Sequence, residues 1–163
     1  MKNEKLKICW LALRSMATKG FTLIELLVVI SIIGILASLA MVSYSGAQKQ
    51  TRDTQRRSDL GQYRNALESY AASNNGVYPV AGAGAITSIC GTGKALEKFI
   101  ASCPADPIGG TYEYRYESDS SGLKYRMWVN GGLETGGTWV VCYNGKTGKT
   151  DNNWSAVTTF CPF

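Results

Sequence analysis

The sequence predicts an α+β protein, in which one long N-terminal helix, hydrophobic in its first half, packs against a small antiparallel β-sheet. Three patterns predict this fold class. The chain has no proline before Pro79, and an apolar run followed by an apolar stripe at helical spacing fills residues 21–73. A helix-stop pattern, Asn-Asn-Gly, follows at residues 74–76. Residues 112–143 then contain segments that alternate apolar and polar side chains, which is typical of strands.

The first half of the predicted helix, residues 21–44, is long and apolar enough to cross a lipid bilayer. From Leu26 to Val42 no side chain is charged, and about 20 apolar residues span the hydrocarbon layer. Glu25 lies at the start of this run, where a buried charge costs roughly 2.5–3.5 kcal/mol on insertion scales. We therefore expect either a partner that neutralises Glu25 or a side chain that reaches the headgroup layer from the helix end.

Residues 1–20 have the composition of a targeting segment. They hold five basic residues and only Glu4 as an acid, and so account for most of the formal net charge of +5. The basic balance of the whole chain therefore does not by itself indicate nucleic-acid binding. A secretory signal peptide cleaved after Ala40 is an alternative, but Glu25 and the uninterrupted helical pattern disfavour it.

The segment Lys19–Ile30 reads KGFTLIELLVVI. It resembles the processing and assembly motif of type IV pilins and of the pseudopilins of type II secretion and competence systems. The resemblance implies that prepilin peptidase cuts between Gly20 and Phe21 and that the new amino terminus on Phe21 is methylated. It also implies that Glu25 neutralises the amine of a neighbouring subunit, which would offset much of the cost of burying the carboxylate.

The same resemblance implies partners, localisation and an order of segments. The chain would polymerise with other pilin subunits and would contact prepilin peptidase and a pilus assembly platform in the cytoplasmic membrane. It would be a single-pass cytoplasmic membrane protein before assembly and part of an extracellular pilus fibre afterwards. The expected segments are a leader (1–20), a transmembrane and fibre-core helix (21–44), an amphipathic continuation of the helix (45–75), a connecting loop (76–110), and an antiparallel sheet with a C-terminal disulfide loop (111–163).

The second half of the helix changes from polar to amphipathic. Gln48–Asp59 is polar on all sides, which indicates exposure to solvent or stabilisation by pairs such as Lys49 with Asp53. An apolar stripe follows and is expected to be buried against the sheet. It consists of Leu60, Tyr63, Leu67 and Tyr70.

A set of basic side chains on this helix could contact DNA phosphates. The set consists of Arg52, Arg56, Arg57 and Arg64. The alternative is that these arginines solvate the helix and pair with acids on neighbouring subunits. Because Asp53 and Asp59 interrupt the basic set, we favour this alternative over DNA binding.

Three strands are predicted at Tyr112–Glu117, Leu123–Val129 and Thr138–Tyr143. Their aromatic faces are expected to cover the helix stripe, and the polar faces of the first two are complementary in charge, as in an antiparallel pair. Trp154–Phe160 is expected to add a fourth strand or a C-terminal loop. The glycine-rich residues before the first strand are expected to form a loop with one helical turn at Leu96, Phe99 and Ile100.

Cysteine usage indicates an oxidising compartment. Cys9 lies in the leader, and Cys90, Cys103, Cys142 and Cys161 remain. With no histidine and no C-x-x-C motif, a zinc site is disfavoured, and four cysteines allow three pairings into two disulfides. We favour Cys90 with Cys103 and Cys142 with Cys161, because each pair closes a nearby loop. The second pair would resemble the C-terminal disulfide loop of many pilins, and disulfides would place this part of the chain outside the cytoplasm.

Nothing in the sequence indicates an enzyme. Without histidine there is no Ser-His or Cys-His arrangement, and no glycine-rich phosphate-binding motif is present. We therefore expect no catalytic residue and no cofactor.

The loop Asn130–Gly137 bears on which kind of pilin this is. Asp106 and Pro107, followed by Tyr112 and Tyr114, resemble the major pseudopilins of type II secretion, which have an acidic calcium loop further along. Here that loop contains only Glu134, whereas calcium takes six to eight oxygens, usually with several carboxylates. We therefore expect no metal site, and this departure favours a pilus or competence pilin.

The expected function is that of a structural pilin of a type IV pilus that serves adhesion, motility or DNA uptake. One alternative is a pseudopilin of a type II secretion or competence apparatus. Another is a membrane-anchored extracellular binding domain that never polymerises.

Overall fold

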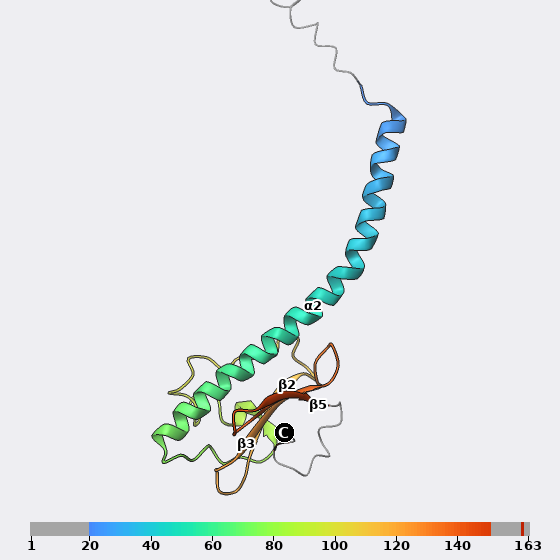
Figure 1. Ribbon diagram of the computed structural model, residues 1–163. Coiled ribbons are helices and arrows are strands. Elements are labelled where there is room, and N and C mark those ends of the chain that lie inside the picture. The colour runs from blue at the N-terminus through green and yellow to red at the C-terminus, as the bar shows by residue number, and fades with distance from the viewer. Residues whose placement is uncertain (1–19, 151–160, 162–163) are drawn as a thin grey trace, which may run out of the picture. The chain divides into compact units, whose positions relative to one another are not determined.

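The computed structural model of the chain describes residues 20–150 and Cys161, apart from the side chain of Val42. It contains one long helix, α2 (Leu23–Ser73), and a five-stranded antiparallel sheet (Figure 1). The predicted α+β fold class is confirmed. The chain divides into two compact units, Met1–Tyr44 and Ser45–Phe163, and α2 contributes to both.

The helix ends where the sequence predicts. Its last residue is Ser73, and Asn75 and Gly76 adopt left-handed backbone conformations with φ of 57° and 80°. The Gly76 N–H donates to the carbonyl of Ala71 at 2.8 Å, and this reversal satisfies a carbonyl that the helix itself leaves unpaired.

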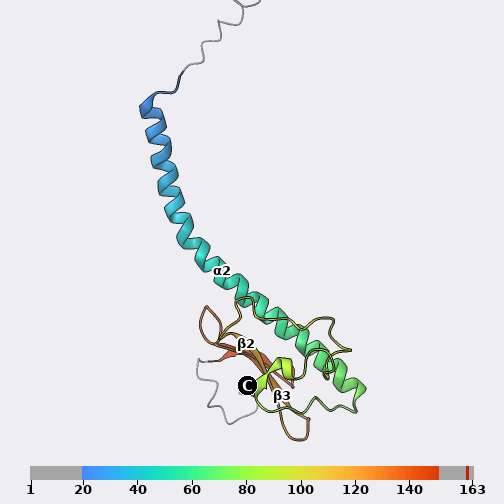
Figure 2. The same ribbon diagram turned by 180° about the vertical axis from the view of Figure 1, so that it is seen from behind.

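The sheet is a simple meander. Its strands are β1 (Gly84–Ala85), β2 (Glu113–Ser118), β3 (Tyr125–Asn130), β4 (Thr138–Cys142) and β5 (Thr147–Thr150). They lie side by side in chain order, and each is antiparallel to the next. Within the second unit one face of this sheet packs on α2, as the view from behind in Figure 2 also shows.

The core of the second unit lies between this sheet face and the helix stripe. Leu60, Tyr63 and Leu67 are fully buried, and Tyr70 packs at the edge of the same cluster, so the predicted burial of the stripe is confirmed. The sheet contributes alternate residues of β2 and β3 and one residue of β4. These are Tyr114, Tyr116, Tyr125, Met127, Val129 and Val141.

The three predicted strands are confirmed as β2, β3 and β4, but two side chains depart from strict alternation. By alternation Leu123 would share the core face with Tyr125 and Met127, but it is 58% exposed because it lies in the turn before β3 begins. By alternation Trp128 would share the polar face with Arg126, but it is only 9% exposed because it packs with Val140, Cys142 and Cys161 in a second cluster on the other side of the sheet.

The structure adds two short strands that the alternation pattern does not reveal. β1 has two residues in a glycine-alanine segment, and β5 is polar and largely exposed at the sheet edge. Short polar edge strands carry little period-two signal, because neither face needs to be apolar. The fourth strand or loop expected at Trp154–Phe160 lies outside the described residues.

The connector between helix and sheet is more than a loop. It forms a short 3-10 helix, η1 (Ile86–Ser88), and buries Ile86, Ile89 and Leu96 in the core. The expected helical turn is present, since the N–H groups of Phe99 and Ile100 both donate to the carbonyl of Leu96.

Two disulfides lie in the second unit. Cys90 is bonded to Cys103, and Cys142 of β4 is bonded to Cys161, with Cα–Cα distances of 6.0 Å in both cases. The first fastens the connector to itself and the second ties a residue near the C-terminus to the sheet. Both bonds remove conformational freedom from the unfolded chain.

Candidate processing and assembly site

The predicted cleavage bond precedes the first turn of α2. Gly20 and Phe21 lie before the helix, which begins at Leu23, and both are exposed, with Phe21 at 87%. An exposed, non-helical segment can enter the active site of a peptidase in extended form, whereas a helical segment must first unwind.

Thr22 and Glu25 form a capping box at the helix start. The carboxylate of Glu25 accepts hydrogen bonds from the backbone N–H of Thr22 at 2.8 Å and from its hydroxyl at 2.7 Å. In return the N–H of Glu25 donates to the Thr22 hydroxyl oxygen at 3.2 Å. This reciprocal arrangement satisfies N–H groups that the first helical turn leaves unpaired, and an acid there complements the helix dipole.

The sequence analysis did not predict that Thr22 caps the helix, although the sequence contains the pattern for a capping box. A threonine followed three residues later by a glutamate, directly before an apolar run, is the pattern of a capping box. Glu25 therefore has partners within its own chain before any neighbouring subunit is present.

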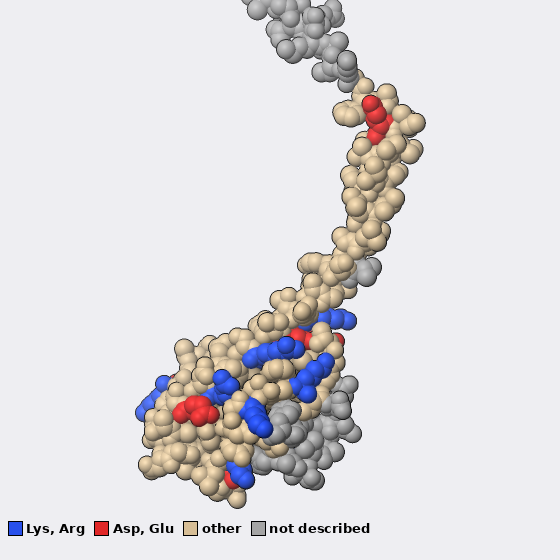
Figure 3. Space-filling model, in the orientation of Figure 1, with Lys and Arg blue, Asp and Glu red and all other residues tan. Residues whose placement is uncertain are grey.

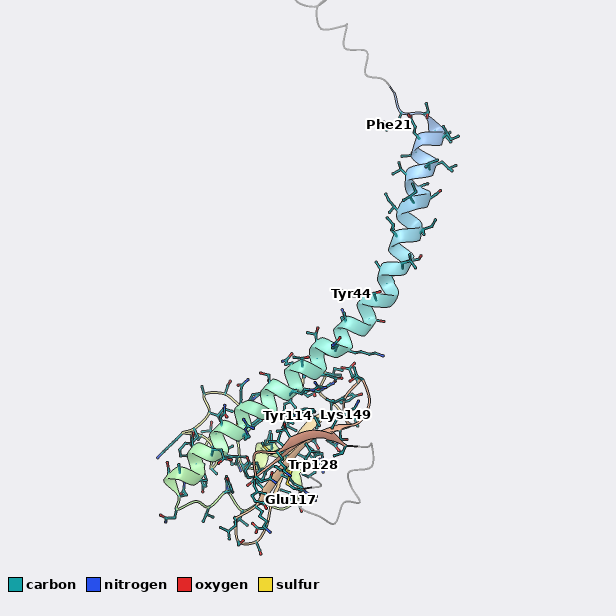
Figure 4. All side chains as sticks on the ribbon, viewed as in Figure 1. Phe21, Tyr44, Tyr114, Glu117, Trp128 and Lys149 are labelled. Atoms are coloured by element: carbon teal, nitrogen blue, oxygen red, sulfur yellow. A yellow bond between two sulfur atoms is a disulfide. The ribbon has the colours of Figure 1, made fainter. Side chains whose placement is uncertain are left out.

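The segment that follows exposes apolar side chains on every side. Each large apolar side chain from Leu23 to Met41 is at least 50% exposed. Figure 4 shows side chains projecting all round the helix between Phe21 and Tyr44. The hydroxyls of Ser31 and Ser38 donate to the carbonyls of Leu27 and Ile35, both at 2.7 Å. The polar groups of this segment are thus satisfied internally, which suits a hydrocarbon environment.

By length and composition α2 can cross a membrane: its most apolar window has a mean hydropathy of 2.7, and none of that window is buried within the protein. In water such a surface would be unfavourable, because burying apolar area is worth roughly 25 cal/mol per Å². Such a surface favours surroundings less polar than water.

In the second unit, a group of charged residues joins α2 to two loops. This charge cluster consists of Arg52, Asp53, Arg56, Asp106 and Glu134. The Arg56 guanidinium is fully buried and bonds to three carboxylates, those of Asp53 at 2.8 Å, Asp106 at 2.6 Å and Glu134 at 3.1 Å. Arg52 adds a bidentate pair to Glu134, with both contacts at 2.6 Å.

Asp53 also holds the glycine-rich loop between β3 and β4. Its carboxylate accepts hydrogen bonds from the N–H groups of Glu134 and Thr135, both at 2.9 Å, and from the Thr135 hydroxyl at 2.7 Å. Asp106 caps its own loop in the same way, accepting from the N–H of Ile108 at 2.9 Å. The charge cluster therefore holds the helix and these two loops together.

These contacts shift the pKa values of the acids. Burial alone would raise the pKa of Asp53, but hydrogen bonds from Thr135, Glu134 and Arg56 outweigh it and lower the pKa. The balance is the same for Asp106, where hydrogen bonds from Arg56 and the Ile108 N–H prevail over burial. The hydrogen bonds from Arg52 lower the pKa of Glu134.

Of the two alternatives for Gln48–Asp59, exposure to solvent is wrong for one face of the helix, and stabilisation by a pair along the helix is present there. Asp53 is 2% exposed, and it pairs with Arg56 rather than with Lys49. The acids that Arg56 binds belong to its own chain and not to neighbouring subunits. The signal for this burial was spacing, since Asp53 and Arg56 continue the stripe of Leu60 and Tyr63 towards the N-terminus at intervals of three and four.

The loop expected to lack a calcium site has its single carboxylate, that of Glu134, bonded to two guanidiniums. Among residues 20–150 and Cys161, no group of three His, Cys, Asp or Glu side chains is placed to hold a metal ion.

Comparisons with known proteins support a family assignment. Residues 15–41 match the family model described as the prokaryotic N-terminal methylation motif. Type II secretion system core protein G of Aeromonas hydrophila is 31% identical over 138 residues, which cover 83% of this chain and 92% of that protein. The chain belongs to the family of type IV pilins and type II secretion pseudopilins. Core protein G of Escherichia coli K12 is a further member, 34% identical over 58% of this chain and 69% of its own length.

Fimbrial members of the family match over a shorter region. Type IV major fimbrial protein FimA of Dichelobacter nodosus is 45% identical over 31% of this chain and 33% of its own length. No solved structure matches the chain significantly. The relatives therefore include both pilins and pseudopilins, and they do not favour one kind over the other for this chain.

Proposed function

We propose that the chain is a structural subunit that prepilin peptidase cleaves between Gly20 and Phe21 and that then polymerises through residues 21–44. One observation carries the proposal: directly after an exposed Gly20–Phe21 bond begins a helix whose apolar surface is exposed on all sides. Before cleavage the helix anchors the subunit in the cytoplasmic membrane. After assembly the helices of neighbouring subunits cover the same surface, and the second unit faces the exterior.

In this account Glu25 acts in assembly and Phe21 carries the methylated amine. The capping box holds the Glu25 carboxylate at the helix start while the subunit is alone in the membrane. In the fibre the carboxylate also meets the amine of a neighbour, and a paired charge in low dielectric recovers much of its desolvation cost. Residues 1–20 serve only as the leader, and residues 45–75 join the membrane helix to the outer unit.

The fibre is either a type IV pilus or the pseudopilus of a secretion or competence apparatus. Relatives of both kinds match, and the proposed mechanism is the same for both. Abundance separates them: a major pilin dominates the fraction sheared from the cell surface, whereas a pseudopilin remains with the cells and its loss abolishes export of specific proteins.

We further propose that the subunit has no enzymatic activity. A surface pocket of about 550 Å³ borders the glycine-rich loop, but its charged side chains are engaged elsewhere. Arg115 bonds to Glu113 at 2.6 Å, and Glu134 bonds to Arg52 and Arg56. These contacts support a structural role for the charged groups around that pocket.

Intact mass measurement of the membrane-extracted protein tests the processing step. The native chain should have lost residues 1–20, whereas Gly20→Val should retain them and show a heavier band on a gel. Gly34→Val, a glycine with no neighbouring atom within 4 Å of an added Cβ, controls for the substitution itself and should be processed normally. A native chain that keeps its leader, or a processed chain found only as monomer, would favour a non-polymerising membrane-anchored domain.

A further inference from the structure

Three large apolar side chains of the second unit are exposed to solvent. Among residues 45–150 and Cys161 they are the only large apolar side chains more than half exposed: Val80 at 62%, Ile108 at 52% and Leu123 at 58%. One such side chain alone is common on a protein surface. These three, however, lie at two separate places on the unit, and hydrogen bonds hold the backbone at both places.

Ile108 is presented by a tight loop that the charge cluster holds. We name Pro107 and Ile108 the loop tip. The Asp106 carboxylate accepts hydrogen bonds from the N–H groups of Ile108 at 2.9 Å and Gly109 at 3.3 Å. The buried Arg56 guanidinium binds the same carboxylate at 2.6 Å, and the ring of Pro107 restricts the backbone further. An apolar side chain on so constrained a loop loses little entropy when it packs against a partner.

The other two exposed side chains lie where the turn between β2 and β3 meets the segment after α2. We name Val77, Val80 and Leu123 the end patch. A Cβ on Gly122, which precedes Leu123, would lie 2.6 Å from a methyl group of Val77. The same Cβ would lie 3.3 Å from a methyl group of Val80, and the Tyr78 N–H donates to the Gly122 carbonyl at 2.8 Å. Figures 1 and 2 both show this turn at the end of the second unit where α2 ends, and Figure 3 shows the outer surface of the unit.

The loop tip and the end patch are far apart along α2. The loop tip is bound to Arg56 through Asp106. The end patch begins just after the helix, where the Val77 N–H donates to the Asn74 carbonyl at 3.1 Å. Arg56 and Asn74 are separated by about 27 Å along the helix at 1.5 Å per residue. The two apolar surfaces of one chain therefore cannot cover each other.

We propose that the loop tip of one subunit packs on the end patch of the next subunit along the fibre. This proposal rests on the polymerisation proposed above and adds a contact outside residues 21–44. An open fibre needs a head-to-tail contact between two different surfaces of the subunit, because such a contact repeats without closing. The loop tip and the end patch are two such surfaces, and they lie at opposite ends of one compact unit.

The separation of the two surfaces is compatible with packing between the apolar helix segments. Residues 23–44 span about 33 Å at 1.5 Å per residue. A neighbour displaced by about 27 Å along the helix direction therefore still overlaps this segment. The contact between the outer units can thus form together with the contact between the apolar segments.

Cysteine cross-linking in fibres sheared from the cell surface, or in pseudopili raised by overexpression, tests the contact. Ile108→Cys and Leu123→Cys are combined in one chain, and a short bis-maleimide joins cysteines that lie close together. The expected product on a denaturing gel is a ladder of dimers, trimers and longer species, because each subunit contacts one neighbour through each surface. Neither single variant should cross-link alone, but cells that make both single variants should give dimers with one chain of each.

The matched control combines Ile108→Cys with Lys98→Cys. Lys98 is exposed on the connector and belongs to neither surface, so this pair should give no ladder.

A charge at the loop tip measures how much the contact contributes. Ile108→Asp leaves the main-chain hydrogen bonds of the loop in place, and the unit should fold as the parent does. Immunoblots of sheared and membrane fractions should show a fibre yield about fivefold lower, because the contact would bury an unpaired charge. Addition of Leu123→Lys should restore most of the yield, since the two charges then face each other across the contact.

Three results would overturn the proposal. Normal fibres that give no ladder would do so and would leave polymerisation through residues 21–44 intact. Cross-linking of Ile108→Cys alone would show that like surfaces meet, and an equal ladder from the control pair would show that the cross-links are unspecific. Absence of fibres from the parent chain would overturn the polymerisation itself and this contact with it.

Discussion

Arg56 and Arg57 are adjacent in the sequence but have opposite environments. Arg56 is fully buried and bonds to three carboxylates, whereas Arg57 is exposed and lies over Trp139. Consecutive helical residues point about 100° apart, so the first faces the interior of the unit and the second faces outward. The same residue type is therefore buried in ion pairs at one position and exposed to solvent at the next.

Replacement of Arg56 by methionine should be strongly destabilising. The substitution leaves the carboxylates of Asp53 and Asp106 buried without a counter-charge, and breaking a buried ion pair in this way costs roughly 3–5 kcal/mol. Urea unfolding followed by tryptophan fluorescence measures the change. Arg57→Met, which loses only an exposed cation–π contact worth about 0.5–1 kcal/mol, is the control. Similar midpoints for the two variants would contradict the structural role of the charge cluster.

At Glu25 two substitutions separate the capping role from the charge. Glu25→Gln retains an acceptor for the Thr22 hydrogen bonds but removes the charge, and Glu25→Val removes both. If the carboxylate neutralises a neighbouring amine, both variants should insert in the membrane and be cleaved, but should yield about tenfold less fibre or lower still. Immunoblots of sheared and membrane fractions give the ratio. Normal fibre yield from Glu25→Gln would assign the residue to helix capping alone.

Among the elements, the turn between β2 and β3 is fixed by a close backbone contact. Gly122 has φ of 67°, and its carbonyl accepts a hydrogen bond from the Tyr78 N–H at 2.8 Å. A Cβ at this position would lie 2.7 Å from the Tyr78 carbonyl oxygen and 2.6 Å from a methyl group of Val77. The turn thus docks on the segment that leaves α2, and only glycine fits there.

Gly122→Ala and Gly145→Ala form a matched pair. Gly145 also has a left-handed backbone, with φ of 78°, but no atom lies within 4 Å of its added Cβ. Gly145→Ala should cost about 1 kcal/mol for the backbone conformation alone. Gly122→Ala should cost a further 1–3 kcal/mol or so for steric overlap. Denaturant midpoints report the difference, and equal costs would mean that the turn is not held against Val77 and Tyr78.

For the whole molecule, the charge cluster predicts sensitivity to acid. Asp53, Asp106 and Glu134 have pKa values below their ordinary values of 3.8, 3.8 and 4.5. The unfolded chain therefore binds protons at a higher pH than the folded chain does. The stability that these acids contribute is complete above the ordinary values and is lost as the pH falls through the lower, folded values.

Thermal unfolding measured by circular dichroism between pH 7 and pH 2.5 checks this dependence. The melting temperature should be nearly constant down to about pH 5 and should fall steeply below about pH 4. Asp106→Asn removes one of the three acids, so its curve should start lower and be flatter in the acid range. A parent protein whose stability is unchanged down to pH 3 would contradict the pKa shifts.

Patterns with a strong physical cause were predictable from the sequence. The apolar run, the stripe at Leu60 and Tyr63 and the helix stop at residues 74–76 each reflect one local rule, and the structure has all three. The charge cluster was not predictable in the same way. The spacing of Asp53 and Arg56 continues the apolar stripe, but Asp106 and Glu134 are far from them in the sequence, and only the tertiary fold brings these acids to Arg56.

The processing site was only partly predictable from the sequence. The cleavage motif is local, and a family model matches it over residues 15–41, but a motif does not reveal that Thr22 and Glu25 bond to each other within one chain.

The central claim is that a new amino terminus on Phe21 is created and is carried into a polymer. Peptide mass spectrometry of fibres sheared from the cell surface, or of pseudopili raised by overexpression, tests it directly. We expect an N-terminal peptide that begins at Phe21 and carries a methyl group on its amine. Fibres whose subunits retain residues 1–20, or begin at Met41 after cleavage behind Ala40, would contradict it.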